Sequence, residues 1–148
     1  PYIMLGYWRD EKASAAVLKP GGWLAMGDVA KLEEGRLYIN SRARDLILVN
    51  AENVSPVEVE YVLEAHADVR EAAVLAVDDE LTGDAILAVV SLEPGRSVDA
   101  VALQAWCAGK LARYKVPTRW HIHDGDLPRT ASGKLVKNRI RELVGGLA

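Results

Sequence analysis

The alternation of strand-like and helix-like segments after residue 45 is the feature that most constrains how this chain can fold. Two segments rich in valine, isoleucine and alanine, 70–78 and 84–92, have the composition of strands. From residue 46 onward the predicted order is strand, helix, strand, strand, helix, strand, helix. This order predicts an α+β fold in which a small mixed sheet is flanked by helices, and we expect the helices on one face.

Turn residues and apolar periodicity set the expected boundaries of these elements. The predicted segments are a strand at 46–49, a turn at 50–53, a helix from 56, strands at 70–78 and 84–92, a helix at about 98–112, a strand at 118–123 and a last helix from about 133. Ser55, Pro56 and Glu58 have the spacing of a capping box with proline at the first helical position. Four apolar residues of the last helix are expected to face inward: Val136, Ile140, Leu143 and Val144.

Residues 1–41 have a different organisation. They predict a short helix at 10–18, a turn at 20–22, and a hairpin whose strands cover 29–32 and 36–40. This block is too small to hold a hydrophobic core alone, and a charged break at 41–45 separates it from the rest. Because the chain begins with proline in a strand-like segment, we expect it to be a piece of a longer protein.

Composition and charge exclude several classes of function. The net charge of −3 gives no sign of a nucleic-acid or membrane surface. No apolar run approaches the ~18 residues of a membrane-spanning helix, and no signal peptide is visible, so we expect a cytoplasmic protein. The single Cys107 excludes an internal disulfide and is expected to be packed in a helix. His66, His121 and His123 have no partners spaced as metal ligands, so no metal site is predicted.

Residues 128–134, Pro-Arg-Thr-Ala-Ser-Gly-Lys, are too small and too polar to be explained by core packing. A loop of this kind, ending in Lys134 before a helical pattern, presents backbone N–H groups and one mobile ammonium to an anion. It is not a Walker P-loop, because Pro128 and Leu135 stand where glycine and serine or threonine are required. From these residues alone, an anion site and a helix entry with a solvated lysine are equally favoured.

Seven short blocks occur in a fixed order along the chain. They are Gly6-Tyr7-Trp8, Gly22-Trp23-Leu24 with Gly27-Asp28, Leu37-Tyr38-Ile39, Arg42 with Asp45 and Ile47, the segment Glu52 to Glu60, Tyr114-Lys115-Val116-Pro117, and Pro128 to Lys134. Their order and spacing resemble the C-terminal end of the AMP-forming acyl-CoA synthetases, in the adenylate-forming ligase superfamily. The resemblance implies that 1–41 ends a large domain that binds ATP and the acid, that 42–45 is a hinge, and that 46–148 is a small lid domain.

The activity implied by the resemblance has two half-reactions. A carboxylic acid is activated with ATP and Mg²⁺ as an acyl-adenylate, and the acyl group is then transferred to CoA. ATP and Mg²⁺ would be bound mainly by the large domain, so this piece is expected to be inactive alone. Two alternatives stay open: an adenylation domain that loads a carrier protein, and a non-catalytic binding module.

The resemblance also implies roles for single residues. Lys134 matches the adenylation lysine, whose ammonium would screen the repulsion between the carboxylate and the α-phosphate of ATP and hold the two in line. Asp28 matches the acid that binds ribose, and Arg42 matches an arginine that lines the nucleotide site, with Ile39 packing near it. Arg44 falls at the hinge position, which is usually aspartate or lysine in the family.

The implied CoA-binding residues depart from the family pattern or match it loosely. Asn50 and Ala51 stand where the family commonly has two glycines beside the pantetheine arm. Asparagine tolerates a left-handed turn, whereas Ala51 adds a methyl group beside that path. By the resemblance, Tyr114, Lys115 and Arg119 lie where members of the family contact the nucleotide of CoA. A basic, aromatic patch suits an adenine ring and phosphates. A solvated surface is the alternative for these three.

The segment from Pro128 to Lys134 also resembles the pattern at which protein acetyltransferases modify bacterial acyl-CoA synthetases. A lysine acetyltransferase and a deacetylase are therefore expected partners. Acetylation would remove the ammonium that the first half-reaction needs.

Overall fold

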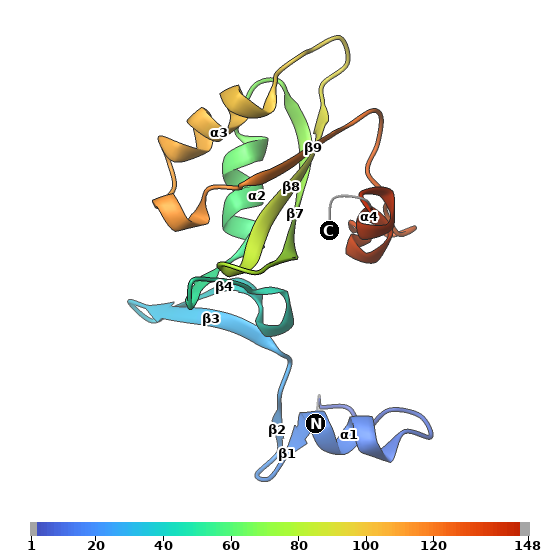
Figure 1. The fold of residues 1–148 in the computed structure, drawn as a ribbon. Coiled ribbons are helices and arrows are strands. Elements are labelled where there is room, and N and C mark those ends of the chain that lie inside the picture. Colours follow the sequence, from blue (N-terminus) through green and yellow to red (C-terminus); the bar gives the residue numbers. More distant parts are fainter. Residues whose placement is uncertain (1–2, 146–148) are drawn as a thin grey trace. The chain divides into compact units, whose positions relative to one another are not determined.

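The computed structural model describes residues 3–145, and the chain divides between Arg44 and Asp45 into two compact units, each drawn in Figure 1. Unit 1 is Pro1–Arg44 and unit 2 is Asp45–Ala148. A short 3-10 helix, Ala43–Asp45, spans the boundary. The predicted hinge at 42–45 therefore contains the point at which one unit gives way to the other.

The described residues of unit 1 form one α-helix and two hairpins, before the 3-10 helix at its end. Helix α1, Glu11–Val17, begins at Asp10, whose carboxylate accepts the N–H of Ala13 at 2.8 Å. The first hairpin pairs β1, Leu18–Lys19, with β2, Trp23–Leu24; the second pairs β3, Asp28–Glu33, with β4, Arg36–Arg42. Among the residues of this unit whose burial is described, Ser41 is the only buried one. This agrees with the expectation that the block holds no core of its own.

Unit 2 is built on a five-stranded sheet. Its strands are β5, Ile47–Val49; β6, Glu52–Val54; β7, Val69–Asp79; β8, Gly83–Leu92; and β9, Arg119–His123. Four of them are ordered β6-β5-β8-β7 with antiparallel pairing, and β9 pairs with β8 in parallel. The predicted small mixed sheet is therefore confirmed.

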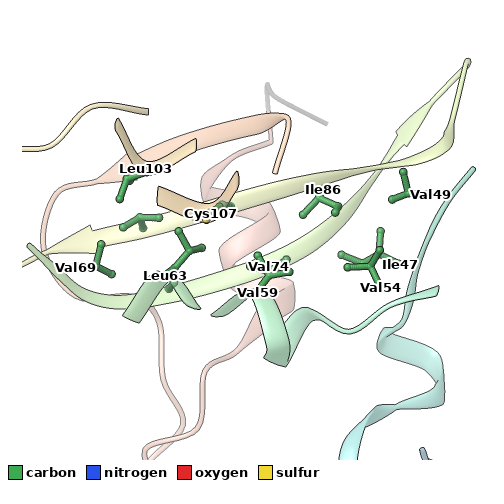
Figure 2. Close-up of a cluster of buried hydrophobic side chains, with 13 residues drawn as sticks. Ile47, Val49, Val54, Val59, Leu63, Val69, Val74, Ile86, Leu103 and Cys107 are labelled. Carbon is green, nitrogen blue, oxygen red and sulfur yellow. The ribbon is translucent and has the colours of Figure 1, made fainter. Parts of the chain in front are cut away.

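Three helices cover this sheet on both faces. Helices α2, Pro56–Glu64, and α3, Ala100–Ala108, lie on one side of β7 and β8, and α4, Lys137–Leu143, lies on the other (Figure 1). Figure 2 shows the first cluster of buried side chains, which includes Leu63 of α2, Leu103 of α3 and Ile86 of β8. In the second cluster, Ile140 of α4 packs with Leu75 of β7.

The expectation that all helices lie on one face was wrong, and the reason is visible in the two long strands. Successive residues of β7 alternate between the clusters: Val74 is buried in the first, and Leu75 in the second. In β8, Ile86 and Leu87 alternate in the same way. A nearly continuous apolar run of this kind indicates a strand that is buried on both faces.

The free edge of β7 is covered by charged side chains. The N–H groups of Ala72 and Val74 donate to the carboxylates of Glu64 and Glu60 at 3.3 and 2.9 Å. The ammonium of Lys137 donates to the carbonyl of Val74 at 3.0 Å and lies 2.9 Å from Glu60. These bonds satisfy backbone groups that an edge strand would otherwise leave open to pairing with another chain.

Several predicted boundaries were wrong. The turn predicted at 50–53 is confined to Asn50 and Ala51, because the next residues form β6. The charged break was predicted to begin at Ser41, but β4 extends through Arg42. The last helix begins at Lys137 rather than near residue 133. Helix α3 is shorter than predicted, at Ala100–Ala108.

The side-chain cap predicted from Ser55 does not form. Ser55 occupies the N-cap position of α2, but its side chain makes no capping hydrogen bond. The carboxylate of Glu58, the other residue of the predicted capping box, accepts two hydrogen bonds from the ammonium of Lys115, at 2.7 and 2.8 Å. Glu58 therefore takes part in a long-range ion pair that the sequence spacing did not indicate.

Candidate functional site

The segment that carries Lys134 is a small hairpin rather than the entry to a helix. Arg129 and Leu135 form an isolated antiparallel bridge. The N–H of Thr130 donates to the carbonyl of Lys134 at 2.8 Å, and the N–H of Gly133 donates to the carbonyl of Thr130 at 2.9 Å. Gly133 has a φ of +84°, which glycine adopts without strain. The backbone at Lys134 is therefore fixed by the turn itself.

This hairpin uses its own N–H groups internally. The N–H of Lys134 donates to the hydroxyl oxygen of Thr130 at 3.1 Å, and the N–H of Val136 donates to the carbonyl of Pro128 at 2.8 Å. These N–H groups are thus not available to an anion, whereas those of Ala131 and Ser132, at the tip of the turn, have no acceptor among the described residues. The hairpin also presents the side chain of Lys134 to an anion.

The ammonium of Lys134 makes no hydrogen bond or ion pair with the part of the chain that the structure describes, and the residue is exposed. Lys137, only three residues further on, is bonded to Glu60 and Val74 as described above. Because its charge is uncompensated, the Lys134 ammonium can approach an incoming anion without first breaking an internal bond.

A buried carboxylate anchors the hairpin to the sheet. Glu71 of β7 is only 6% exposed, and one of its oxygens accepts the N–H of Leu127 at 2.7 Å. Its other oxygen accepts from the guanidinium of Arg129, with Nε at 3.0 Å. The third nitrogen of Arg129, Nη1, donates to the carbonyl of Gly133 at 2.5 Å. Sequence reasoning missed Glu71; the available signal was an acid immediately before the apolar run 72–77 of β7.

Two predicted nucleotide-binding residues are brought together in unit 1. Asp28 and Arg42 are partners at the open end of the β3–β4 hairpin, and Nε of Arg42 lies 2.9 Å from Oδ1 of Asp28. Nη1 of Arg42 also donates to the carbonyl of Met26 at 3.1 Å. The side chain of Arg42 is half exposed, so guanidinium nitrogens can still reach a ligand. Ile39, on the same strand, is 65% exposed.

The predicted hinge residue, Arg44, lies in the 3-10 helix and is the last residue of unit 1. It is therefore placed where a change of backbone angles would alter the relation between the units.

A cavity of about 560 Å³ opens within unit 2. Its walls come from the β5–β6 turn, the loop between β7 and β8, and the segment that leads into β9. Three of the five residues predicted to bind CoA line it: Asn50, Tyr114 and Arg119. Arg113 also lines the cavity and was not predicted.

Asp79, the last residue of β7, gives this cavity an anionic wall. Asp79 accepts hydrogen bonds from the hydroxyl of Thr82 at 2.9 Å and from the N–H groups of Leu81 and Thr82, both at 3.1 Å. The bond from the Thr82 hydroxyl, followed by the two backbone bonds, lowers the pKa of Asp79. Nη2 of Arg119 lies 3.4 Å from the same carboxylate, so this arginine is already partly compensated.

The two residues that replace the expected glycines both have left-handed backbones. The φ angles are +50° for Asn50 and +66° for Ala51. A two-residue turn of type I′ between antiparallel strands requires positive φ at both positions, which explains why glycine suits them. Asparagine tolerates this conformation, whereas alanine is strained by about 1–2 kcal/mol. The N–H of Asn50 is held by the carbonyl of Thr82 at 2.9 Å.

Lys115 has a different surrounding from the one predicted. Its ammonium is paired with Glu58, and its side chain is only 20% exposed. It also lies 5.7 Å from the centre of the Tyr114 ring. These contacts tie the segment before β9 to helix α2, so the geometry favours a structural role for this lysine over a ligand contact.

Cys107 is buried as expected, and burial raises the pKa of its thiol to about 11. Among the described residues, no group of three or more histidine, cysteine, aspartate or glutamate side chains could hold a metal. In that same part of the chain, no helix is long and apolar enough to cross a membrane.

Comparisons with known proteins give a consistent result. Residues 58–134 match the family described as the AMP-binding enzyme C-terminal domain. The chain is 43% identical over 145 residues to the 2-succinylbenzoate–CoA ligase of Geobacillus kaustophilus, covering 97% of the chain and 29% of that relative. It is 41% identical over 145 residues to the indoleacetate–CoA ligase of Aromatoleum aromaticum, covering 97% of the chain and 28% of that relative. The chain therefore spans less than a third of the length of these curated relatives.

Solved structures are similar over the same region. The amide bond synthetase McbA from Marinactinospora thermotolerans has a TM-score of 0.85 and 40% identity, covering 95% of this chain and 29% of that one. The o-succinylbenzoate CoA synthetase MenE from Bacillus subtilis, in complex with the acyl-adenylate OSB-AMP, has a TM-score of 0.85 and 38% identity. It covers 94% of this chain and 28% of the MenE chain.

Proposed function

The chain belongs to the AMP-binding enzyme C-terminal domain family, and on that premise we propose that it is the C-terminal part of an AMP-forming ligase that joins a carboxylic acid to coenzyme A. In the proposed first half-reaction the carboxylate attacks the α-phosphate of ATP, and pyrophosphate leaves as the acyl-adenylate forms. In the second, the thiol of coenzyme A attacks the acyl carbonyl and displaces AMP. Two curated relatives that are CoA ligases support this assignment.

The free ammonium of Lys134 is the observation that carries the proposal. The two partners of the first half-reaction are both anions, so their approach is opposed by charge repulsion. An ammonium placed between the acid oxygen and the phosphate offsets that repulsion and stabilises the charge that develops during attack. Lys134 supplies such a group, because its backbone is fixed by the hairpin and its amine is bonded to no described residue.

We assign Asp28 and Arg42 to the nucleotide. A carboxylate can accept hydrogen bonds from both ribose hydroxyls, and Arg42, 2.9 Å away, would hold that carboxylate in orientation. Ile39 offers an exposed apolar side chain on the same strand. The remaining contacts to ATP, and the Mg²⁺ that would accompany its phosphates, are assigned to the rest of the protein, since the chain covers 29% of its first curated relative.

We further propose that the two units act as separate bodies. Residues 1–41 would complete a large domain, residues 42–45 would be a hinge, and residues 46–148 would be a lid that changes orientation between the half-reactions. The division of the chain at Arg44 supports this organisation. The cavity lined by Asn50, Tyr114 and Arg119 would receive part of coenzyme A. Tyr114 offers a ring to the adenine and Arg113 a guanidinium to a phosphate, whereas Arg119 is already paired with Asp79.

The decisive experiment uses the full-length protein and a panel of carboxylic acids. Pyrophosphate release is measured with ATP and each acid, with and without CoA, and the acyl products are identified by mass spectrometry. We expect one class of acid to stimulate pyrophosphate release and to yield an acyl-CoA and AMP. Absence of stimulation by every acid, in a folded protein that binds ATP, would contradict the proposal.

The acceptor is the part of the proposal with a specific rival. McbA, an amide bond synthetase, has a structure similar to this chain, and the glycines expected beside the pantetheine path are replaced by Asn50 and Ala51. Amine acceptors and a phosphopantetheinyl carrier protein are therefore included in the assay beside CoA. Faster consumption of the adenylate by either one than by CoA would reassign the second half-reaction.

Acetylation of Lys134 by a protein acetyltransferase is a regulatory extension of the proposal. Its support is the exposed amine at the end of the segment Pro128 to Lys134. The protein would act in the cytoplasm, where ATP and CoA are available. Mass spectrometry of protein from cells grown under several conditions tests the modification, and an unmodified Lys134 in all of them would count against it.

A further inference from the structure

We propose that Glu71 and Arg129 are positioning residues for adenylation, and that they act by fixing the hairpin that presents Lys134. The inference rests on the proposed function, because it concerns the step in which Lys134 would meet ATP. Neither residue is expected to touch a substrate. Their effect would pass through the backbone of the hairpin to the lysine.

Glu71 is a buried carboxylate whose hydrogen-bond donors lie in the segment that leads to Lys134. Its side chain is 8% exposed, and its two oxygens accept the N–H of Leu127 at 2.7 Å and the guanidinium of Arg129. Arg70 lies 3.7 Å away and is turned mainly to Asp126 and Ser91. Burying a carboxylate is costly, and replacing such a pair by apolar residues is often neutral or stabilising. Stability alone therefore gives a weak reason for an acid at this position.

Arg129 completes the connection from the sheet to the lysine. Its Nε and Nη2 bind Glu71, and its Nη1 binds the carbonyl of Gly133, the residue immediately before Lys134. The guanidinium is a rigid, planar fork that can hold both acceptors at once, whereas a lysine ammonium would not reproduce that geometry. A continuous set of bonds thus runs from β7 through Glu71 and Arg129 to the base of Lys134.

The hairpin needs this support because most of its residues are outside the core. Residues 129–134 are all exposed, and only Leu127 and Leu135 attach the flanking segments to the apolar cluster beneath. A catalytic group that is displaced by about 1 Å can lose about 10²-fold in rate. The long side chain of Lys134 adds freedom of its own, so fixing its backbone limits how far the ammonium strays.

The test compares Arg129→Lys and Glu71→Gln with Arg139→Lys in the full-length protein. Arg129→Lys keeps a positive charge beside Glu71 but loses the fork, and Glu71→Gln leaves one acceptor oxygen where two are used. Arg139 is an exposed arginine on α4 for which the described residues provide no partner, so it is the matched control. Pyrophosphate release and thioester formation from a supplied acyl-adenylate are measured separately.

We expect Arg129→Lys and Glu71→Gln to lower kcat for pyrophosphate release by about 10- to 100-fold. Thioester formation should stay within about twofold, because that step does not use Lys134, and the control should change neither. Equal loss of both half-reactions would indicate a purely structural role and overturn the proposal. Unchanged adenylation in the two variants would also overturn it.

Amide hydrogen exchange separates this inference from the proposed function. In the full-length protein, exchange of the peptide covering 128–136 should be about tenfold faster in Arg129→Lys than in Arg139→Lys, as expected when one charge-assisted hydrogen bond to the turn is lost. This readout needs no substrate. If exchange of this peptide is the same in Arg129→Lys and Arg139→Lys, the positioning role is refuted even if the enzyme is active. Faster exchange would support that role even if the enzyme uses a different acid chemistry.

Discussion

Lys134 and Lys137 are three residues apart, and replacing each by alanine should separate catalysis from stability. The ammonium of Lys137 is 2.9 Å from Glu60 and donates to the carbonyl of Val74 at 3.0 Å. The side chain of Lys137 is 27% exposed and that of Glu60 is 15% exposed. Lys134 is exposed, and its ammonium is bonded to no described residue. One lysine therefore has structural partners, and the other is free to meet a substrate.

The expected magnitudes follow from these contacts. Lys137→Ala removes hydrogen bonds that involve a charged group, so the free energy of unfolding should fall by about 1.5–3 kcal/mol. Glu60 would keep its bond from the N–H of Val74, which limits the loss. Lys134→Ala removes no internal bond, so the free energy of unfolding should change by less than about 0.5 kcal/mol. Its adenylation rate should instead fall by about 10²–10³-fold, as when a donor aimed at developing charge is removed.

The assay pairs urea unfolding of the chain with the two half-reactions of the full-length enzyme. Lys134→Ala should lose pyrophosphate release and keep thioester formation from a supplied acyl-adenylate, while Lys137→Ala should unfold at a lower urea concentration. Lys12→Ala, at an exposed position on α1 of unit 1, serves as the control for both measurements. Normal adenylation by Lys134→Ala would refute the reasoning, and so would a loss of stability as large as that of Lys137→Ala.

Four further substitutions or conditions test separate parts of the structure. Arg44→Pro should slow thioester formation more than pyrophosphate release, because proline restricts the backbone at the proposed hinge; equal loss would indicate misfolding. Ala51→Gly should raise the free energy of unfolding by about 0.5–1 kcal/mol, since glycine relieves the left-handed strain at φ +66° but loses more chain entropy. The pKa of Asp79 is lowered in the folded chain, so its contribution to the free energy of unfolding is present above pH 3.8 and is lost as pH falls through the lower folded pKa. In Asp79→Asn, the free energy of unfolding should therefore fall less steeply as the pH is lowered in the acid range. The thiol of Cys107 has its pKa raised from 9.0 to about 11, so stability should fall as pH rises between those values; an unchanged slope in Cys107→Ala would contradict this.

The sequence predicts the elements of unit 2 well because their apolar patterns are long. Strands β7 and β8 lie within a residue or two of their predicted positions, since uninterrupted valine, isoleucine and alanine favour extended chain. The placement of α4 was harder to predict. Ile140 and Val144 are buried as expected, but spacing along a helix says nothing about which face of a sheet it will cover. Leu143, also expected to face inward, is 47% exposed.

The candidate site shows the same division between local pattern and long-range contact. The segment ending in Lys134 was found from its own residues, but Glu71, which holds it, is 58 residues away from Arg129 in the chain. The pairing of Asp28 with Arg42 depends on a bulge between Val29 and Ala30. Continuing the register of the rest of the hairpin, in which Ala30 faces Ile39, would place Asp28 opposite Ser41 instead. The sequence around the bulge contains no local signal that predicts the extra residue.

The residues of the proposed chemistry are divided between two units that differ greatly in how much hydrophobic core they contain. Unit 2 buries two apolar clusters around its sheet, whereas Ser41 is the only buried residue among those of unit 1 whose burial is described. On the proposed function, Asp28 and Arg42 would hold the nucleotide on unit 1, and Lys134 would reach it from unit 2. On the same proposal a movement at Arg44 would bring the lysine to the phosphate, and rotation of a firmly packed body moves every attached group by a defined amount. In the proposed scheme, the anchoring of the Lys134 hairpin by Glu71 and Arg129 would keep the ammonium at a defined position on unit 2, whereas an ammonium on a loose loop would occupy many positions.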